Sequence, residues 1–233
     1  MEDLTMAQAY RLFGHVGLFS IFGAILFGFR HDPGVPWGNL LFGAALYGAW
    51  AAVHLAMTSD RFKRAVYGDR VGSPIERRVY IVVTVATWLA VLWYHPPLPG
   101  PALDVPGPLR FAATVGFLMA LFAFFEGMTF AAIDGLIAAP GTEVAYSHGA
   151  ETKLLTEGRY AAVRHPMYQA AILAGLCSLI IHANPAQLFW VLMIGGTFIG
   201  FIPLEEARLL AKRGDEYRAY MSRTPWRLVR AVW

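Results

Sequence analysis

The chain has 233 residues, of which 57% are hydrophobic and only 15% are charged. Its mean hydropathy of +0.47 is too high for a soluble domain of this length, so lipid is the expected solvent for much of its surface. The net charge of +3 gives no reason to expect nucleic-acid binding, because basic residues also set membrane topology. The single cysteine excludes a disulfide framework and a cysteine-based metal site, and we expect no metal.

Apolar stretches follow one another along the chain, and crossing a bilayer core takes about 20 apolar residues. Four such stretches occupy 10–29, 37–57, 79–94 and 109–133. Two more, 167–182 and 186–204, are separated only by Ala-Asn-Pro, which favours a tight turn. We therefore expect an all-α integral membrane protein with five to six transmembrane helices, the last two forming a helical hairpin.

The positions of lysine and arginine predict the orientation, because cytoplasmic loops carry an excess of them. With six crossings and a cytoplasmic N-terminus, only Arg30 and Arg110 fall at the outer face. We expect both termini in the cytoplasm of a bacterial inner membrane. Charge and proline further divide the chain into a membrane-embedded four-helix half, 1–133, and a region with a polar cytoplasmic loop, the hairpin and an amphipathic tail, 134–233.

Polar residues gather at both ends of the hairpin. Arg164 and His165 precede Pro166, which fits the first position of a helix whose free N–H groups favour an anion. The hairpin returns Glu205 and Glu206 to the same membrane face, about 10 Å away. Because adjacent helical residues differ by about 100°, we expect one glutamate to face a ligand and the other to pair with an arginine such as Arg208. The simpler alternative is that the cation sets topology and the histidine is interfacial.

The tail beyond the hairpin contains a second polar pattern. Gly214 should interrupt the helix, and Asp215 can cap a new one. On that helix Tyr217 and Tyr220 share a face at a spacing of three residues. They suit either a ligand site or anchorage at the lipid headgroups.

Taken in order, these segments resemble the isoprenylcysteine carboxyl methyltransferase superfamily, which includes phospholipid N-methyltransferases and bacterial methanethiol S-methyltransferases. The resemblance covers about residues 154 to 225. Its matching segments are Gly158-x-Tyr160, Arg164-His165-Pro166-Met167-Tyr168, Glu205-Glu206-Ala207-Arg208-Leu209 and Gly214-Asp215-Glu216-Tyr217-Arg218-Ala219-Tyr220.

The resemblance implies that these residues enclose S-adenosyl-L-methionine. It assigns Arg164, His165 and the helix start at Tyr168 to the carboxylate end of the cofactor, and one of the two glutamates to the ribose or ammonium. The remaining implied cofactor-binding residues are Gly158, Tyr160, Pro166, Tyr217 and Tyr220, whose tyrosines are candidates for adenine stacking or sulfonium contact. We interpret His165, Arg164 and the intramembrane Glu126 as candidate catalytic residues.

The acceptor is left open by the sequence. The segments 54–64, 75–80 and 93–99 are more loosely similar to the methanethiol S-methyltransferase branch and to NnrU-like proteins. The acceptor is therefore a small or lipid-like molecule, such as a thiol, a prenylcysteine carboxylate or a phospholipid amine, and no obligate protein partner is evident. Intramembrane His15 and His54 serve a site or an interhelical hydrogen bond. Two other classes compete: an NnrU-like haem protein or isomerase, with His54 and His165 as axial ligands, and a small transporter.

Overall fold

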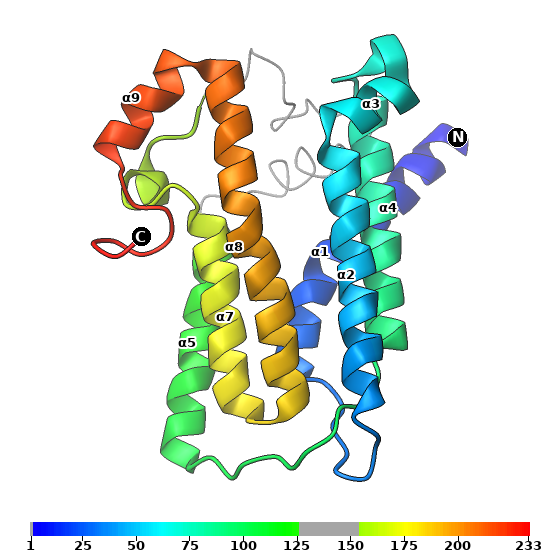
Figure 1. Ribbon diagram of the computed structural model, residues 1–233, viewed down its shortest axis with the longest axis vertical. Helices are drawn as coiled ribbons and strands as arrows, with labels where there is room; N and C mark the ends of the chain where they lie inside the picture. The colour runs from blue at the N-terminus through cyan, green and yellow to red at the C-terminus, as the bar shows by residue number, and fades with distance from the viewer. Residues whose placement is uncertain (1, 126–153) are drawn as a thin grey trace. The chain divides into compact units, whose positions relative to one another are not determined.

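The computed structural model describes residues 2–125 and 154–233, and throughout these ranges the chain is helical with connecting turns and no β-strand. The all-α prediction is confirmed for this part of the chain. The described residues form two compact units, 2–99 and 100–125 together with 154–233. Each unit is a group of helices seen in Figure 1.

The first unit is built on a long helix that packs against two others. It consists of α1 (Glu2–Phe27), α2 (Gly38–Thr58), α3 (Asp60–Tyr67), the 3-10 helix η1 (Gly68–Arg70) and α4 (Pro74–Tyr94). Helix α4 packs against both α1 and α2. Trp88 of α4 donates its indole N–H to the Ser20 hydroxyl of α1 at 3.1 Å. The short α3 begins at Ser59, whose hydroxyl accepts from the Phe62 N–H and so caps the helix.

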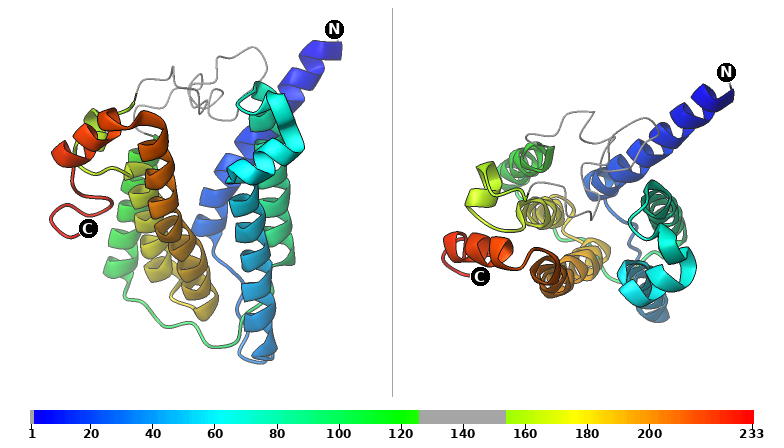
Figure 2. Two further views of the ribbon diagram at one scale, coloured as in Figure 1. Left: turned by 45° about the horizontal axis from the view of Figure 1, so that its top comes forward. Right: turned by 90° about the horizontal axis from the view of Figure 1, so that it is seen from above.

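The second unit places the hairpin beside a third apolar helix. It contains α5 (Gly107–Phe125), the 3-10 helix η2 (Gly158–Ala161), α7 (Pro166–His182), α8 (Pro185–Arg213) and α9 (Asp215–Arg223). Figure 2 shows α5, α7 and α8 side by side. The buried face of α7 carries mainly small residues, including Ala170, Ala174 and Gly175. Small side chains allow neighbouring helices to approach closely, as apolar helices without a hydrophobic driving force require.

The predicted hairpin is present, and local residues explain its tight turn. Ala183 ends α7 in the left-handed region with φ of +43°. Asn184 caps α8 by accepting a hydrogen bond from the Gln187 N–H at 2.8 Å. The Gln187 side chain then donates to Ser178 across the hairpin at 2.8 Å, with both residues fully buried. This polar pair sets the register of α8 on α7, because breaking it would leave a buried polar group without a partner.

The apolar character of the helices indicates a membrane protein. Three described helices, α2, α5 and α8, are long and apolar enough to cross a membrane, and α7 is apolar but shorter. Large apolar side chains remain exposed on their outer surfaces, for example Leu41 on α2, Phe122 on α5 and Leu192 on α8. The six crossings expected from the sequence are not confirmed by these helices.

The compact units do not follow the expected division at residue 133. Helix α5 precedes that boundary but belongs to the unit of α7 and α8. It packs along α7, where an added Cβ on Gly116 would lie 3.0 Å from the Cys177 sulfur. Charge and proline mark the ends of helices, but they carry no information about which helices are neighbours.

A glycine pair on α1 provides a test of the first unit. A Cβ on Gly17 would clash with a methyl carbon of Val85, whereas a Cβ on Gly23 meets nothing within 4 Å. We expect Gly17→Ala to destabilise the protein by about 1–3 kcal/mol through overpacking. The control Gly23→Ala should be neutral or slightly stabilising, because alanine favours a helix over glycine. Thermal denaturation in one detergent compares the two, and equal midpoints would contradict the packing of α1 on α4.

Candidate active site

The residues that precede α7 are held in place by the end of the chain. The Arg164 N–H donates to the Trp226 carbonyl at 2.9 Å, and the His165 N–H donates to the Arg227 carbonyl at 3.0 Å. Pro166 then occupies the first helical position and is buried, as the sequence predicts. The segment that follows α9 therefore fixes the backbone from which both candidate side chains project.

Glu206 of α8 is the centre of a buried ionic cluster. Its Oε1 accepts from Arg164 Nε at 2.7 Å and lies 3.1 Å from His165 Nε2. Its Oε2 accepts from Arg227 Nε at 2.9 Å. Glu206 is only 3% exposed, and such a buried carboxylate is tolerated because charged donors replace the lost water. The cluster joins the approach to α7, the polar end of α8 and the C-terminal segment.

Arg164 is itself almost fully engaged by the protein. Besides its contact with Glu206, it donates from Nη1 to the Thr224 carbonyl at 2.8 Å. The residue is 7% exposed. An interpretation of Arg164 only as a topology-setting cation leaves these buried contacts unexplained.

Glu205 differs from its neighbour in having spare hydrogen-bonding capacity. Its Oε2 lies 3.6 Å from His165 Nδ1, which is longer than a hydrogen bond. Within the described part of the chain this oxygen is buried without a hydrogen-bond partner, although the side chain as a whole is 44% exposed. A carboxylate oxygen in that state is suited to accept a hydrogen bond from a ligand.

The sequence prediction of these contacts was correct in outline and wrong in one detail. Arg164 pairs with Glu206, and His165 lies close to both glutamates, because long side chains close the expected separation between the helices. The charged partners of Glu206 are Arg164 and Arg227 rather than Arg208. The His165 ring lies between the two carboxylates, so adjacent glutamates reach one residue from different sides.

Three parallel rings extend from this cluster along the hairpin. His165 stacks on Tyr168 with ring centroids 5.6 Å apart and an interplanar angle of 8°. Tyr168 in turn stacks on Phe198 of α8 at 5.0 Å and 10°. The histidine is thus held by carboxylates at its nitrogens and by an aromatic face. Phe198 was not among the predicted site residues, because it is one of many apolar residues in its helix.

The two tyrosines predicted on the tail helix are both buried. Tyr217 and Tyr220 are 1% and 2% exposed, and their ring centroids are 5.8 Å apart, which confirms their shared helical face. The Tyr220 hydroxyl donates to the Tyr160 carbonyl at 2.8 Å. Burial raises the pKa of Tyr220 to about 12, so its hydroxyl stays protonated at neutral pH. Burial and then the Glu206 carboxylate raise the pKa of Tyr217 as well.

A glycine with positive φ precedes each segment that carries these tyrosines. Gly158 begins η2 with φ of +61°, and Gly214 separates α8 from α9 with φ of +50°, a conformation that glycine adopts at little cost. The predicted interruption at Gly214 is confirmed. The predicted cap is wrong, because Asp215 is the first helical residue and its carboxylate pairs with Arg218 at 3.0 Å.

Some predicted residues lie elsewhere. Glu126 lies outside the described residues. His54 is buried in α2, where its Nδ1 lies 3.0 Å from the Trp50 carbonyl and its Nε2 has no hydrogen-bond partner. His15 lies on α1. Both histidines belong to the first compact unit.

Sequence reasoning missed the residues that the chain supplies after α9, namely Thr224, Trp226 and Arg227. Arg227 was interpreted only as one basic residue of the tail. The sequence did contain a signal for such a residue. A glutamate that is buried near the end of an apolar helix needs charged partners. The sequence alone could not choose that second partner among the basic residues of the tail.

Comparison with known proteins finds a relative that is named as a methyltransferase. The chain is similar to methanethiol S-methyltransferase 1 from Bradyrhizobium diazoefficiens, with 30% identity over 191 residues. The similarity covers 78% of this chain, and the chain spans 65% of the length of that relative. No family model and no solved structure matches the chain. The cluster therefore lies in an apolar helical protein that is distantly similar to a methyltransferase.

The two adjacent glutamates can be separated by experiment. Glu206→Gln leaves Arg164 and Arg227 without their buried counter-charge, so we expect a loss of roughly 3 kcal/mol of stability. Glu205→Gln should cost about 1 kcal/mol or less, because that side chain is nearly half exposed. Thermal denaturation of both variants in one detergent measures the difference. Equal destabilisation would contradict the assignment of Glu206 as the buried hub.

Proposed function

We propose that the protein is an integral membrane methyltransferase that uses S-adenosyl-L-methionine and belongs to the isoprenylcysteine carboxyl methyltransferase superfamily. The observation that carries the proposal is the buried contact of Arg164-His165 with Glu205-Glu206. These are the segments whose order resembles the superfamily. The similarity to a methanethiol S-methyltransferase supports the same activity independently of the geometry.

The chemistry of the cluster fits the proposed cofactor. S-adenosylmethionine offers an ammonium, a ribose diol, a carboxylate and an adenine ring, and it supplies a methyl carbon activated by a sulfonium. The buried Oε2 of Glu205 has room for a hydrogen bond from the ammonium or the ribose. The positive end of the α7 helix dipole, beside Arg164, favours a carboxylate. Tyr168 presents an aromatic ring at the same helix start.

The protein's own contribution to methyl transfer is positioning, exclusion of water and removal of a proton. A displacement at an activated carbon gains most from correct alignment of the acceptor. A thiol or amine acceptor must also lose a proton, and we assign His165 as the base because Glu206 at Nε2 and the stacked Tyr168 ring fix its imidazole. Arg164 holds Glu206 in place and favours a thiolate acceptor by its charge. A catalytic role of Glu126 stays a prediction.

The topology proposed with this function uses six helices. These are α1, α2, α4, α5, α7 and α8, which have 26, 21, 21, 19, 17 and 29 residues. A length of about 20 residues suffices to cross the bilayer core. The distribution of lysine and arginine supports cytoplasmic termini in a bacterial inner membrane, with the site facing the cytoplasm. The proposed cofactor region remains 134–233, and all described site residues lie within it.

A small thiol is the acceptor that the observations support best, since the relative is named for methanethiol. Prenylcysteine carboxylates and phospholipid amines are the alternatives within the superfamily. The haem-binding alternative has less support, because His165 Nε2 is already within hydrogen-bond distance of the Glu206 carboxylate. A haem-binding role also leaves Glu205 Oε2, which has no hydrogen-bond partner among the described residues, without a function.

Cofactor binding tests the proposal directly. Calorimetry on the full chain in nanodiscs should detect binding of S-adenosylhomocysteine. Glu205→Ala should weaken that binding roughly tenfold or more, as expected for losing a hydrogen bond to a charged group. The matched control is Glu216→Ala on α9, which removes a 55% exposed carboxylate that pairs with Arg213. A folded wild-type protein that does not bind, or equal losses in both variants, would argue against the proposal.

A second experiment identifies the acceptor. Methyl-labelled S-adenosylmethionine is supplied with methanethiol, a prenylcysteine or phosphatidylethanolamine, and labelled product is measured. We expect label in the methylated thiol, at a rate that falls at least roughly tenfold in Glu205→Ala. Transfer to the prenylcysteine or the lipid alone would reassign the acceptor. Cofactor binding without transfer to any of the three would refute all three acceptor classes.

A further inference from the structure

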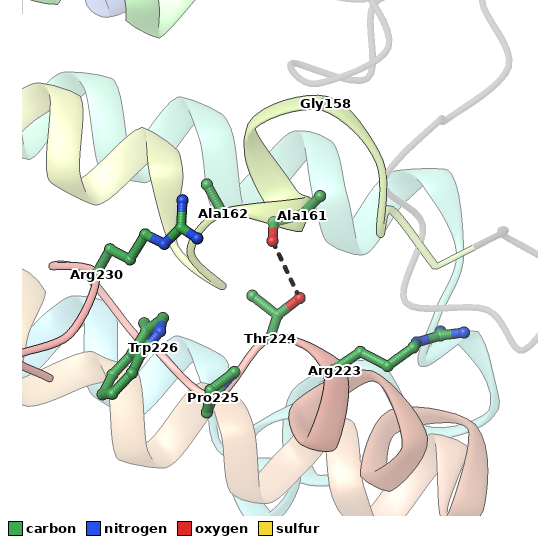
Figure 3. A pocket seen from close by; sticks show the side chains of 8 residues that line it. All are labelled: Gly158, Ala161, Ala162, Arg223, Thr224, Pro225, Trp226 and Arg230. Atoms are coloured by element: carbon green, nitrogen blue, oxygen red, sulfur yellow. Dashed lines mark hydrogen bonds between the residues drawn. The ribbon is translucent and has the colours of Figure 1, made fainter.

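A hollow of about 300 Å³ lies between η2 and the segment that follows α9. Figure 3 shows it from close by. Its lining residues are Gly158, Ala161, Ala162, Arg223, Thr224, Pro225, Trp226 and Arg230. No acidic side chain lines it, whereas two arginines do. The hollow therefore combines a positive charge with a cavity open to a ligand.

The two arginines flank the hollow and have no acidic partner. Arg223 is the last residue of α9, and Arg230 lies in the C-terminal segment. In Figure 3 the Arg230 side chain reaches toward Ala162, while Arg223 extends in the other direction. Among the described residues, no carboxylate forms an ion pair with either guanidinium. Other tail arginines, such as Arg213 and Arg218, pair with neighbouring acids.

The size and walls of the hollow suit more than a bare ion. A water molecule occupies about 30 Å³ of liquid, so the volume corresponds to roughly ten waters. Trp226 and Pro225 supply apolar walls, and the small side chains of Ala161 and Ala162 leave the opposite side open. An arginine fork matches the oxygens of a phosphate group. An esterified phosphate with an organic part fits this combination better than free phosphate does.

The position of the hollow places it beside an apolar helix end. Ala162 lies four residues before Pro166, where the apolar α7 begins. Lipid headgroups occupy the layer next to such helix ends. Val229 and Val232, which flank Arg230, are 48% and 75% exposed. An arginine between exposed apolar side chains is typical of a segment that lies in the membrane interface.

We propose that this hollow binds the phosphate of an anionic phospholipid headgroup, with Arg230 as its cationic ligand and Arg223 adding positive charge at the far rim. The proposal rests on the charge, volume and position of the hollow. It does not rest on methyl transfer. The proposed lipid site adjoins the cluster around Glu206, because Thr224 and Trp226 line the hollow and also accept hydrogen bonds from Arg164.

Lipid binding to the delipidated full chain tests the proposal. Native mass spectrometry in a neutral detergent compares phosphatidylglycerol with phosphatidylcholine. The wild type should prefer phosphatidylglycerol, and Arg223→Gln/Arg230→Gln should weaken its binding roughly tenfold or more, since each arginine contributes about 1 kcal/mol. Binding of phosphatidylcholine should not change. The control Arg61→Gln/Arg64→Gln removes the same charge from exposed positions of α3 and should have a smaller effect.

Four results would overturn the proposal. Equal affinity of the wild type for both lipids, or equal losses in the two double variants, would remove the evidence for a specific site. Inorganic phosphate that binds as tightly as phosphatidylglycerol would make free phosphate the ligand. If the double variant keeps its lipid affinity but loses S-adenosylhomocysteine, the hollow belongs to the cofactor site. If the double variant fails to fold, the single variant Arg230→Gln is tested for the loss of phosphatidylglycerol binding instead. Its thermal midpoint checks that it is folded.

Discussion

The second unit depends on one buried carboxylate. Glu206 sits at the polar end of α8, and it accepts hydrogen bonds from arginines that come from two other segments. Burying a charge costs several kcal/mol unless its partners are in place, so those segments must take their positions together. The approach to α7, the end of α8 and the segment after α9 are thereby joined at one point. The shape of the candidate site follows from that requirement.

The same contact explains why two adjacent glutamates have different roles. Successive residues of a helix point about 100° apart, so Glu205 points to a different side of α8 when Glu206 points into the cluster. Glu205 is partly exposed and retains an oxygen without a hydrogen-bond partner. His165 lies between them, and its ring is further fixed by Tyr168. A rigid inner group and an adaptable outer one are what a binding site on a helix end needs, because preorganisation lowers the cost of binding.

Local signals in the sequence predicted the elements that depend on neighbouring residues. The hairpin turn at Asn184 and the break at Gly214 follow from backbone preferences, and both were predicted. The meeting of Arg164 with Glu206 also follows, because an antiparallel hairpin returns its ends to one face. The sequence predicted less well which distant residues and helices contact one another. Nothing in the pattern indicated that Arg227 completes the cluster, since several basic residues of the tail were equivalent by sequence. Nor does periodicity tell that α5 packs on α7, because small residues such as alanine and glycine carry little hydrophobic signal.

The central claim is that the region around Glu206 holds S-adenosylmethionine. Ultraviolet cross-linking of the labelled cofactor to the full chain in nanodiscs, followed by mass spectrometry of the peptides, tests it most directly. The label should appear in peptides that contain Tyr160, Tyr168 or the segment after Leu204, and excess S-adenosylhomocysteine should remove it. Competable label confined to peptides from 2–99 would contradict this assignment of the cofactor site.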